Sequence, residues 1–377
     1  MLAGSGSVFA DETVPPDAAV VHTVDSVQIK HTDPAKSITL SADGLDNADN
    51  RIRRLAAGEQ ATDAVNLAQL QAVEAKADRT GYVHVNTGDV NQAEGNEQTN
   101  EGTIDAKGGA RALGAVAAGK AAKAYGKYGI SIGEEARAGD RGRGSAAAAA
   151  DLGKHAIAIG YKANAYNVSN SSPDLPNAAA GIAIGANAVA SQNAVHIGNV
   201  TNTRAIQSEG KWQYNNRRGS TTVGAESYNG AVLGSIFGSG SKITAGEAEV
   251  GSFEIFGRRI PGVRTQGTAS TVVGAYNTVI ANNKDKEWDG VANHISGAAN
   301  KITDSNGALI VGSGNQINNA YRDEQFTMGD ASAIVAGNLD VLRDKELGSV
   351  GIIGGGNLAE NVIRSQVIGV GNTLKGS

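Results

Sequence analysis

The 377-residue chain is 40% hydrophobic but only 4% aromatic, contains no cysteine and carries a formal net charge of −5 at pH 7. Its 51 glycines are about 14% of the residues, roughly twice the usual share. Basic residues form no stripe, which argues against nucleic-acid binding, and the lack of cysteine excludes disulfides and thiolate chemistry. A core built mainly of alanine, valine and isoleucine must be thin, as in a solenoid or fibre.

The first residues have the character of the end of a secretory signal peptide. Residues 1–10 are small or apolar and end on Val-Phe-Ala, which fits signal peptidase, but the basic stretch that opens such a leader is missing. They are interpreted either as the remnant of a leader, which implies export, or as a chance feature. No apolar run approaches the about 20 residues that a membrane-spanning helix needs.

Residues 11–43 predict a small module of short strands. Two runs, 24–29 and 37–40, lie on either side of Asp33-Pro34, and apolar and polar residues alternate in the first of them.

Residues 44–80 predict a turn-rich entry followed by a helix. Thr62 or Asp63 can cap the start of this helix, whose length of about 15 residues is marginal in isolation. A broad apolar stripe therefore needs partners. It consists of Val65, Leu67, Leu70, Val73 and Ala77. Residues 81–110 are polar and glycine-spotted, and predict one strand around Val83 followed by a linker loop.

A short pattern recurs through residues 111–218. Residues 181–198, GIAIGANAVASQNAVHIG, state it twice, with branched residues at alternate positions before Gly185 and Gly198. This is typical of one face of a short strand followed by a tight corner. Further copies are Ala-Leu-Gly at 112–114, Ser-Ile-Gly at 131–133 and Ala-Ile-Gly at 158–160.

Glycine spacing gives the period of the repeat. Gly185 to Gly198 is 13 residues, whereas Gly160 to Gly185 is 25, or 14 without the loop 167–177. The spacings from Gly133 to Gly160 (27) and from Gly198 to Gly224 (26) are interpreted as two units each. A unit this small cannot bury its apolar face alone, so the pattern predicts stacked coils of about 13 to 15 residues with insertions as loops on one side.

Residues 219–377 predict a variant of the same repeat. Thr-Val-Gly at 222–224 and Val-Leu-Gly at 232–234 continue the strands, and asparagine now recurs three residues after a glycine. Asparagine tolerates left-handed backbone and can bond to neighbouring turns, so a stack of asparagines is expected at one corner. Its members are Asn277, Asn300, Asn315, Asn357 and Asn372.

No catalytic, cofactor or metal motif is complete. The segment from Gly114 to Ala121 is one residue short of a phosphate loop, because Ala121 stands where Ser or Thr must bind magnesium. The six histidines lack ligand spacing, and His196 is interpreted as an outward or interface packing residue rather than a metal ligand. We therefore predict no metal and no cofactor.

Three insertions concentrate residue types that are enriched at interface hot spots. Both tryptophans of the chain lie in them, so they either bind a ligand or staple the insertion to the roll or to a neighbouring chain. The candidate ligand-binding residues are Trp212, Tyr214, Arg217, Arg218, Phe253, Phe256, Arg258, Arg259 and Trp288.

Two sets of motifs resemble one protein family. Residues 44–70, ending in DAVNLAQL, are similar to the neck and connector of trimeric autotransporter adhesins, and the repeats at about 124–198 resemble their YadA-like head. The resemblance implies a predominantly all-β homotrimer of left-handed parallel β-rolls with a short coiled-coil neck. It also implies export to the outer membrane surface of a Gram-negative bacterium, where such heads bind a host cell-surface or matrix protein, a glycan or other cells.

The resemblance assigns roles to several residues. Val65, Leu67, Leu70 and Val73 are expected to make trimer contacts in the neck, and alternate positions such as Ala183 and His196 to face a neighbouring chain or solvent. The family's stalk and membrane barrel do not follow within these residues, so membrane attachment is expected only through a C-terminal anchor outside them. The expected interior of each roll is Ile130, Ile132, Ile157, Ile159, Ile182, Ile184, Val195 and Ile197.

Two functions from different classes remain open. The first is a non-enzymatic adhesin head that binds through loops or faces of the trimer. The alternative is a parallel β-solenoid enzyme that degrades polysaccharide, as tailspikes do, for which paired carboxylates are needed. The carboxylates available for it are Glu247, Glu249, Asp285 and Glu287.

Overall fold

The structure is a computed structural model, and it divides the chain into two compact units, Met1–Lys76 and Ala77–Ser377. The residues that it describes are 20–22, 26–30, 32–33, 37–47, 51–77, 80–139, 154–165, 181–190, 193–201, 219–244, 252–255, 258–261, 266–281, 289–320 and 350–376.

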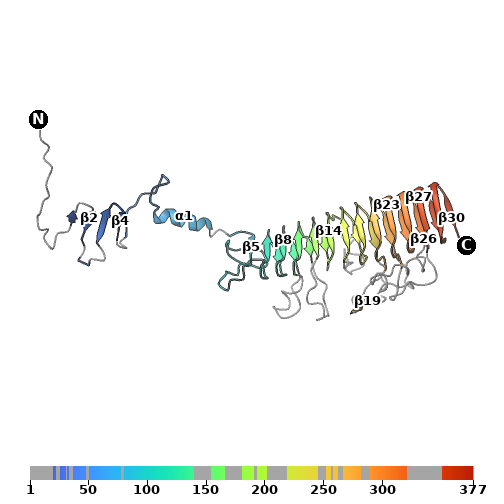
Figure 1. The fold of residues 1–377 in the computed structure, drawn as a ribbon, viewed down its shortest axis with the longest axis horizontal. Helices are drawn as coiled ribbons and strands as arrows, with labels where there is room; N and C mark the ends of the chain where they lie inside the picture. Colours follow the sequence, from blue (N-terminus) through green and yellow to red (C-terminus); the bar gives the residue numbers. More distant parts are fainter. Residues whose placement is uncertain are drawn as a thin grey trace, which may run out of the picture. The chain divides into compact units, whose positions relative to one another are not determined.

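The first unit contains a four-stranded antiparallel meander in the order β1-β2-β3-β4 (Figure 1). The strands predicted within 24–29 and 37–40 are confirmed as β2 and β3. Polar and apolar residues alternate along both, and Ile29, Leu40 and Leu45 remain exposed. The four strands are β1 (Val20–His22), β2 (Ser26–Ile29), β3 (Ile38–Ser41) and β4 (Gly44–Asp46).

The one helix of the described chain, α1 (Leu67–Ala77), starts later than predicted. Asn66 Oδ1 accepts from the Gln69 N–H at 3.0 Å, and Gln69 Oε1 accepts from the Asn66 N–H at 3.2 Å, so this pair forms a capping box. The predicted cap, Asp63, instead closes the preceding turn. Its carboxylate accepts from the N–H groups of Gln60 and Glu59, which lower its pKa.

No helix among the described residues has the length and apolar character needed to cross a membrane.

The second unit is a stack of parallel coils, each of which contributes a strand to a common first sheet (Figure 1). That sheet has 13 strands, and only its end strand β5 pairs antiparallel. β5 confirms the strand predicted around Val83. In chain order the strands are β5 (Val83–Val85), β6 (Val116–Ala118), β8 (Ile130–Ile132), β10 (Ile157–Ile159), β12 (Ile182–Ile184), β14 (Val195–Ile197), β15 (Thr221–Val223), β17 (Ser235–Phe237), β21 (Thr271–Val273), β23 (His294–Ala298), β25 (Leu309–Ser313), β27 (Val350–Gly355) and β29 (Ser365–Val370).

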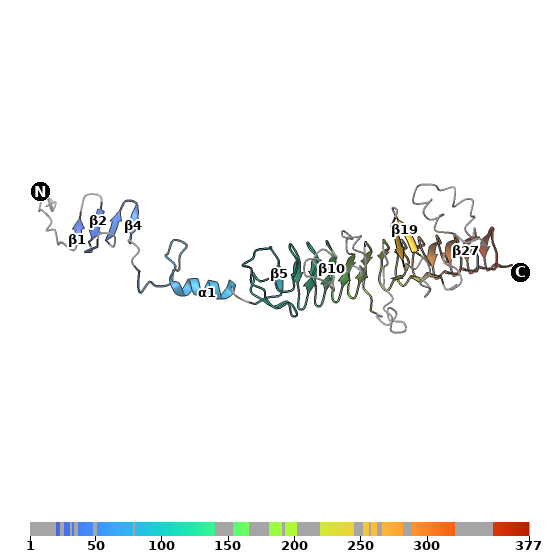
Figure 2. The ribbon, with the colours of Figure 1, turned by 90° about the horizontal axis from the view of Figure 1, so that it is seen from below.

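After a glycine corner, most coils add a strand to a second wall of the roll (Figure 2). This wall consists of two parallel sheets, of four and of seven strands. The first contains β7 (Lys123–Ala124), β9 (Arg137–Ala138), β11 (Asn164–Ala165) and β13 (Val189–Ala190). The second contains β16 (Tyr228–Asn229), β18 (Lys242–Thr244), β22 (Thr278–Ile280), β24 (Lys301–Thr303), β26 (Gln316–Asn318), β28 (Leu358–Glu360) and β30 (Thr373–Lys375). A separate antiparallel hairpin joins β19 (Ser252–Ile255) to β20 (Arg258–Pro261).

The isoleucines and valines predicted to fill the interior point outward instead. In each three-residue strand of the first sheet the middle residue is buried. Ala183 and His196, which were expected to face a neighbouring chain or solvent, are therefore fully buried, while Ile132 and Ile197 are 41% and 40% exposed. The prediction was wrong because alternation separates two faces of a strand without saying which face is inside. The residues assigned to the wrong face are Ile130, Ile132, Ile157, Ile159, Ile182, Ile184, Val195 and Ile197.

The interior changes composition along the roll. Its first part is a cluster made only of alanines, from Ala110 to Ala194. From Ala231 onward the cluster contains mostly isoleucine and valine, including Ile236, Ile295 and Ile310. The thin core expected from composition therefore applies to the first half of the roll alone.

Direct pairing corrects two interpreted spacings. β8 pairs with β10, and β14 with β15, so each of the longer glycine spacings is one coil with an insertion rather than two coils. β10 likewise pairs with β12, which confirms one coil interrupted by 167–177, a loop outside the described residues. Residues 112–114 and 232–234 form turns instead of strands, and Leu233 has a positive φ of 55°.

The expected asparagine stack is confirmed. Asn300 Nδ2 donates to Asn277 Oδ1 at 3.0 Å and to the carbonyl of Gly312 at 2.7 Å. Asn315, Asn357 and Asn372 repeat the bond to the preceding asparagine. The stack ties the glycine corners of successive coils together.

A folded segment, residues 81–111, covers the first coil, where the sequence predicted a linker loop after β5. Asn100 is fully buried and its Nδ2 donates to the carbonyls of Tyr82 and Gly119 at 2.8 and 2.9 Å. Its Oδ1 accepts from the Gly109 N–H at 2.7 Å, and its own carbonyl lies 3.1 Å from His84 Nε2. We call residues 81–111 the N-terminal cap; the Asn100 side chain joins two parts of it, at Tyr82 and Gly109, to Gly119 of the first coil.

Candidate interaction surfaces

Each strand of the first sheet aligns a set of three residues with its neighbours: an outward one, a buried one and a second outward one. The second outward residues, at the third position, form a column along the outer face of the sheet. Parallel pairing places Ile132 beside Ile159, Ile184 beside Ile197, and so on along the roll. Phe237 is 46% exposed and Ile368 is 70% exposed, although each lies in register with apolar neighbours. We name this set the third-position column: Ala118, Ile132, Ile159, Ile184, Ile197, Val223, Phe237, Val273, Ser296, Val311, Ile353 and Ile368.

A second outward column, the first-position column, changes character halfway along the sheet. It is entirely apolar over the alanine-filled coils and mostly polar over the isoleucine-filled coils. Its apolar part is Val116, Ile130, Ile157, Ile182 and Val195, and its later part is Thr221, Ser235, Thr271, His294, Leu309, Gly351 and Gln366. The apolar outer surface is therefore wider where the interior is thinner.

The second wall has a mostly polar outer surface, with Val189, Ile280 and Leu358 as apolar exceptions. Lys123 pairs with Arg137, and Lys301 pairs with Gln316, in columns that point away from the interior. Lys375 Nζ also forms an ion pair with Glu360 Oε2 at 3.0 Å on this side. The contrast between the two walls marks the first sheet as the surface suited to contact with another protein surface.

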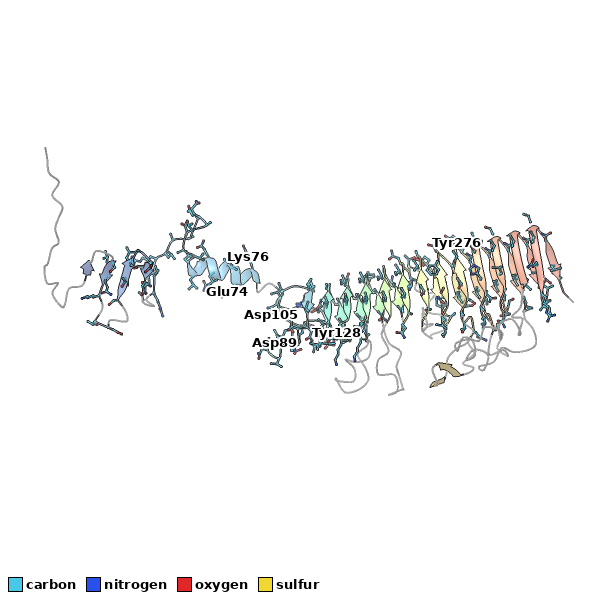
Figure 3. All side chains as sticks on the ribbon, in the orientation of Figure 1. Glu74, Lys76, Asp89, Asp105, Tyr128 and Tyr276 are labelled. Carbon is cyan, nitrogen blue, oxygen red and sulfur yellow. The ribbon has the colours of Figure 1, made fainter. Side chains whose placement is uncertain are left out.

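Long insertions leave the roll from one edge. Segments 140–153, 166–180, 245–265, 282–288 and 321–349 all follow a strand of the second wall and precede a strand of the first sheet. The glycine corners on the opposite edge accept no insertion in the described coils. Figure 3 shows Tyr128 on the edge from which the insertions leave and Tyr276 on the glycine edge. Segment 202–218 is different, because it follows Thr201 where a second-wall strand would begin.

Few of the predicted binding residues fall within the described chain. The backbone places Phe253 in β19 and Arg258 and Arg259 in β20, where Phe253 pairs with Ile260. The remaining candidates lie outside the described residues, as do the four carboxylates of the enzyme alternative. The binding candidates outside the described residues are Trp212, Tyr214, Arg217, Arg218, Phe256 and Trp288.

The apolar stripe of the neck lies open in the single chain. Val65, Leu67, Leu70 and Val73 are 65%, 67%, 50% and 60% exposed. Gln69 also bonds to both the N–H and the carbonyl of Gly58, so the turn before the helix is fixed while the stripe is not covered.

The described residues offer no metal site. No three His, Cys, Asp or Glu side chains among them lie close enough together to hold an ion. The clearest charged cluster, on the N-terminal cap, joins Glu94 to Lys107 at 2.7 Å and to Arg111 at 2.9 Å. Hydrogen bonds from Lys107 and Arg111 lower the pKa of Glu94. These partners bind one another, which suits a structural role.

Sequence reasoning missed the structural roles of the buried polar residues. Asn100, His84 and His196 are not part of a recurring motif, so no repeat in the sequence indicates that they are buried. The alanines between branched residues did carry a signal, because Ala117, Ala158 and Ala183 recur at the middle position of each strand.

No family model, no curated protein and no solved structure matches this chain. The resemblance to trimeric autotransporter adhesins therefore depends on the head and neck motifs alone.

Proposed function

We propose that the chain is the head of a non-enzymatic adhesin on the outer surface of a Gram-negative bacterium, and that it acts as a homotrimer of left-handed rolls. The observation that carries the proposal is the third-position column. All of its members except Ser296 are apolar. Proteins rarely leave so long a nearly apolar row open to water, and such rows mark interaction surfaces. Burying the exposed half of one isoleucine or valine contributes about 1 kcal/mol. The column supports an extended interface along the whole roll.

The edge that carries the insertions supports a binding role. Rigid coils that present several loops on one side are a common arrangement for recognition. In the proposed trimer, the apolar first sheets face one another and the insertions stay accessible. Their aromatic and arginine residues then bind a host cell-surface or matrix protein, or a glycan. The neck stripe adds a short coiled coil to the proposed trimer.

The oligomeric state tests the trimer. Mass photometry of the purified chain should give three copies per particle, and Phe237→Ser combined with Ile353→Ser should lower the trimer fraction. The matched control is Lys301→Ser on the second wall, which should leave it unchanged. A wild-type chain that is monomeric at micromolar concentration would overturn the proposal.

Cell binding tests the insertions separately. Trp212→Ala combined with Arg217→Ala should weaken binding of the purified head to host cells and leave the thermal unfolding midpoint unchanged. A lower midpoint in this variant would instead assign these residues to stapling the insertion. Neither outcome of this cell-binding test bears on the oligomeric state, so the binding role and the trimer can fail independently.

A further inference from the structure

The first sheet becomes wider along the roll, on the side of its glycine corners. From β6 to β21 its parallel strands have three residues each and end just before the corner glycine. β23 and β25 have five residues, β27 and β29 have six, and all four strands run through the corner glycine. Their pairing continues beyond it, with Ala298 beside Ser313 and Gly355 beside Val370. The outer surface of the sheet therefore extends toward the glycine edge in the isoleucine-filled half.

Charge at the glycine edge follows the same division. We name the two residues after each corner glycine a corner pair. From β6 to β15 the corner pairs contain the charged residues Lys120, Glu134, Glu135, Lys162 and Glu226. From β17 to β29 they contain no charged residue and consist of Ser239-Gly240, Ala275-Tyr276, Ala298-Ala299, Ser313-Gly314, Gly355-Gly356 and Val370-Gly371. Another surface can therefore approach the glycine edge of the isoleucine-filled half without burying a charge.

The first-position column changes in the opposite sense. It lies on the other side of the third-position column from the glycine edge, and it is apolar from Val116 to Val195 but mostly polar from Thr221 onward. An uncharged band therefore runs the length of the sheet and moves sideways along it. The band combines the third-position column with the first-position column in the alanine-filled half, and with the corner pairs in the isoleucine-filled half.

Tyr276 is the large side chain on the uncharged part of the glycine edge (Figure 3). It is 72% exposed, and its φ of 56° lies in the left-handed region, as does the φ of Gly240 in the coil before it. A tyrosine rarely adopts this backbone. Its ring lies against Gly240, where a Cβ would come within 2.6 Å of a ring carbon, so the ring is held in place. A strained, exposed and fixed aromatic residue is typical of an interaction anchor.

The band fits a second copy of the chain. Its twelve parallel strands, β6 to β29, lie about 4.8 Å apart, which makes the band about 50 Å long. At about 12 Å wide, two columns of side chains offer about 600 Å², close to the roughly 800 Å² that one partner buries in a stable interface. A parallel second copy offers an uncharged band of the same length that moves sideways at the same level. A shorter or highly charged partner would match only part of it.

We propose that the contact between copies moves across the roll along its length. It covers both outward columns of the first sheet in the alanine-filled half, and the third-position column with the corner pairs in the isoleucine-filled half, where Tyr276 is its anchor. This inference rests on the trimer proposed above and identifies the parts of each copy that meet. The contact also moves away from the edge from which segments 245–265, 282–288 and 321–349 leave the roll.

Cysteine labelling tests the course of the contact, because the chain has no cysteine of its own and one introduced thiol reports on one position. Ile157→Cys and Thr271→Cys compare the first-position column in the two halves. Lys162→Cys and Ala299→Cys compare the corner pairs, at matched φ values of 54° and 55°. Assembly should slow maleimide labelling by about tenfold or more at residues 157 and 299, and by less than about twofold at residues 271 and 162, relative to the same variant diluted to single copies.

Mass photometry of the same samples separates two kinds of failure. Single copies at micromolar concentration would overturn the trimer, and this inference with it. Trimers in which residue 271 is protected and residue 299 is not would overturn the course of the contact and leave the trimer standing. Equal protection at all four positions would do the same.

Tyr276→Gly tests the anchor. Glycine accepts the left-handed backbone, so the unfolding midpoint of diluted single copies should not fall, while the trimer should dissociate at a concentration at least about fivefold higher. Lys162→Gly is the matched control at the same backbone position in the alanine-filled half, and its dissociation should stay within about twofold of the wild type. Unchanged dissociation of Tyr276→Gly would show that Tyr276 is not an anchor of the contact.

Discussion

The asparagine stack allows the energetic consequence of one substitution to be worked out. Asn315 is fully buried, and its Nδ2 donates to Asn300 Oδ1 at 3.0 Å and to the Gly354 carbonyl at 2.9 Å. Its Oδ1 accepts from the N–H and the Nδ2 of Asn357 at 3.0 and 2.9 Å. Asn315→Ala removes all four bonds and deprives the Asn357 N–H and the Gly354 carbonyl of this partner. At about 1 to 3 kcal/mol for each buried group, the free energy of unfolding should fall by about 2 to 6 kcal/mol.

Urea unfolding at fixed protein concentration measures this change, with hydrogen exchange to locate it. The loss of protection should centre on the coils of β25 to β28, because solenoid coils contact only their neighbours. Gln316→Ala is the matched control, since this exposed residue directly follows Asn315 at the start of β26 and should change stability by less than about 0.5 kcal/mol. Asn315→Ala within that same range would refute the reasoning.

Asn315→Asp sharpens the test. The carboxylate keeps an acceptor toward Asn357 but turns negative charge toward Asn300 Oδ1 and the Gly354 carbonyl, so its pKa should rise above the ordinary Asp value. Because the pKa is then higher in the folded roll than in the unfolded chain, stability is lost as the pH increases from the ordinary Asp pKa toward the raised one. The variant should therefore unfold more easily at pH 7 than at pH 4, relative to the wild type.

Three further substitutions have clear expectations. Asn100→Ala should destabilise the N-terminal cap by about 2 to 5 kcal/mol because the Gly119 carbonyl and Gly109 N–H lose a buried partner, which exchange protection of residues 81–111 would reveal. Gly312→Ala should cost more than about 3 kcal/mol, since its φ is 138° and a Cβ there would overlap the Gly354 carbonyl. Gly356→Ala, at φ 65° with open space around it, should cost only about 1 to 2 kcal/mol in the same urea assay.

Local chemistry explains which parts of the fold were predictable. A glycine after a strand with branched residues at alternate positions predicts a tight corner, and these corners stack closely on one another, as Gly185 does on Gly198. The Ala-Leu-Gly and Val-Leu-Gly copies at 112–114 and 232–234 form turns instead. The asparagine stack followed from the same reasoning, because Asn three residues after Gly can reach the neighbouring turn. Both features depend on a few adjacent residues, which the sequence displays directly.

Which side of each strand is buried depends instead on what packs against it, and that cannot be read from the strand's own residues. Ile182 and Ala183 alternate equally well with either of them inside, and the larger side chain was the natural choice for the interior. The interior of the first half is narrow enough to be filled by alanine, so the isoleucines face outward. The role of Asn100 could not be predicted either, because its side chain bonds to the backbone of Tyr82 and Gly119, which lie 18 and 19 residues away in the chain.

The two halves of the roll divide their apolar volume in opposite ways. Burying the methyl of an alanine contributes about 0.8 kcal/mol, against up to about 3 kcal/mol for an isoleucine. Coils around Ala158 and Ala183 therefore gain little from their own interior and carry isoleucine in both outward columns. Coils around Ile310 and Ile352 gain most of their stability inside and keep one apolar column outside, which is interrupted only at Ser296 of the coil before them.

This division predicts an order of unfolding for the proposed trimer. If copies meet through the first sheet, the alanine-filled half depends on its neighbours more than the isoleucine-filled half does. Dilution, or Phe237→Ser with Ile353→Ser, should then remove exchange protection from residues 130–165 before residues 294–318. Simultaneous loss in both segments would show that the interior composition does not decide the stability of each half. Earlier loss in the isoleucine-filled half would reverse the argument, because the outer columns would then contribute less than the interior alanines.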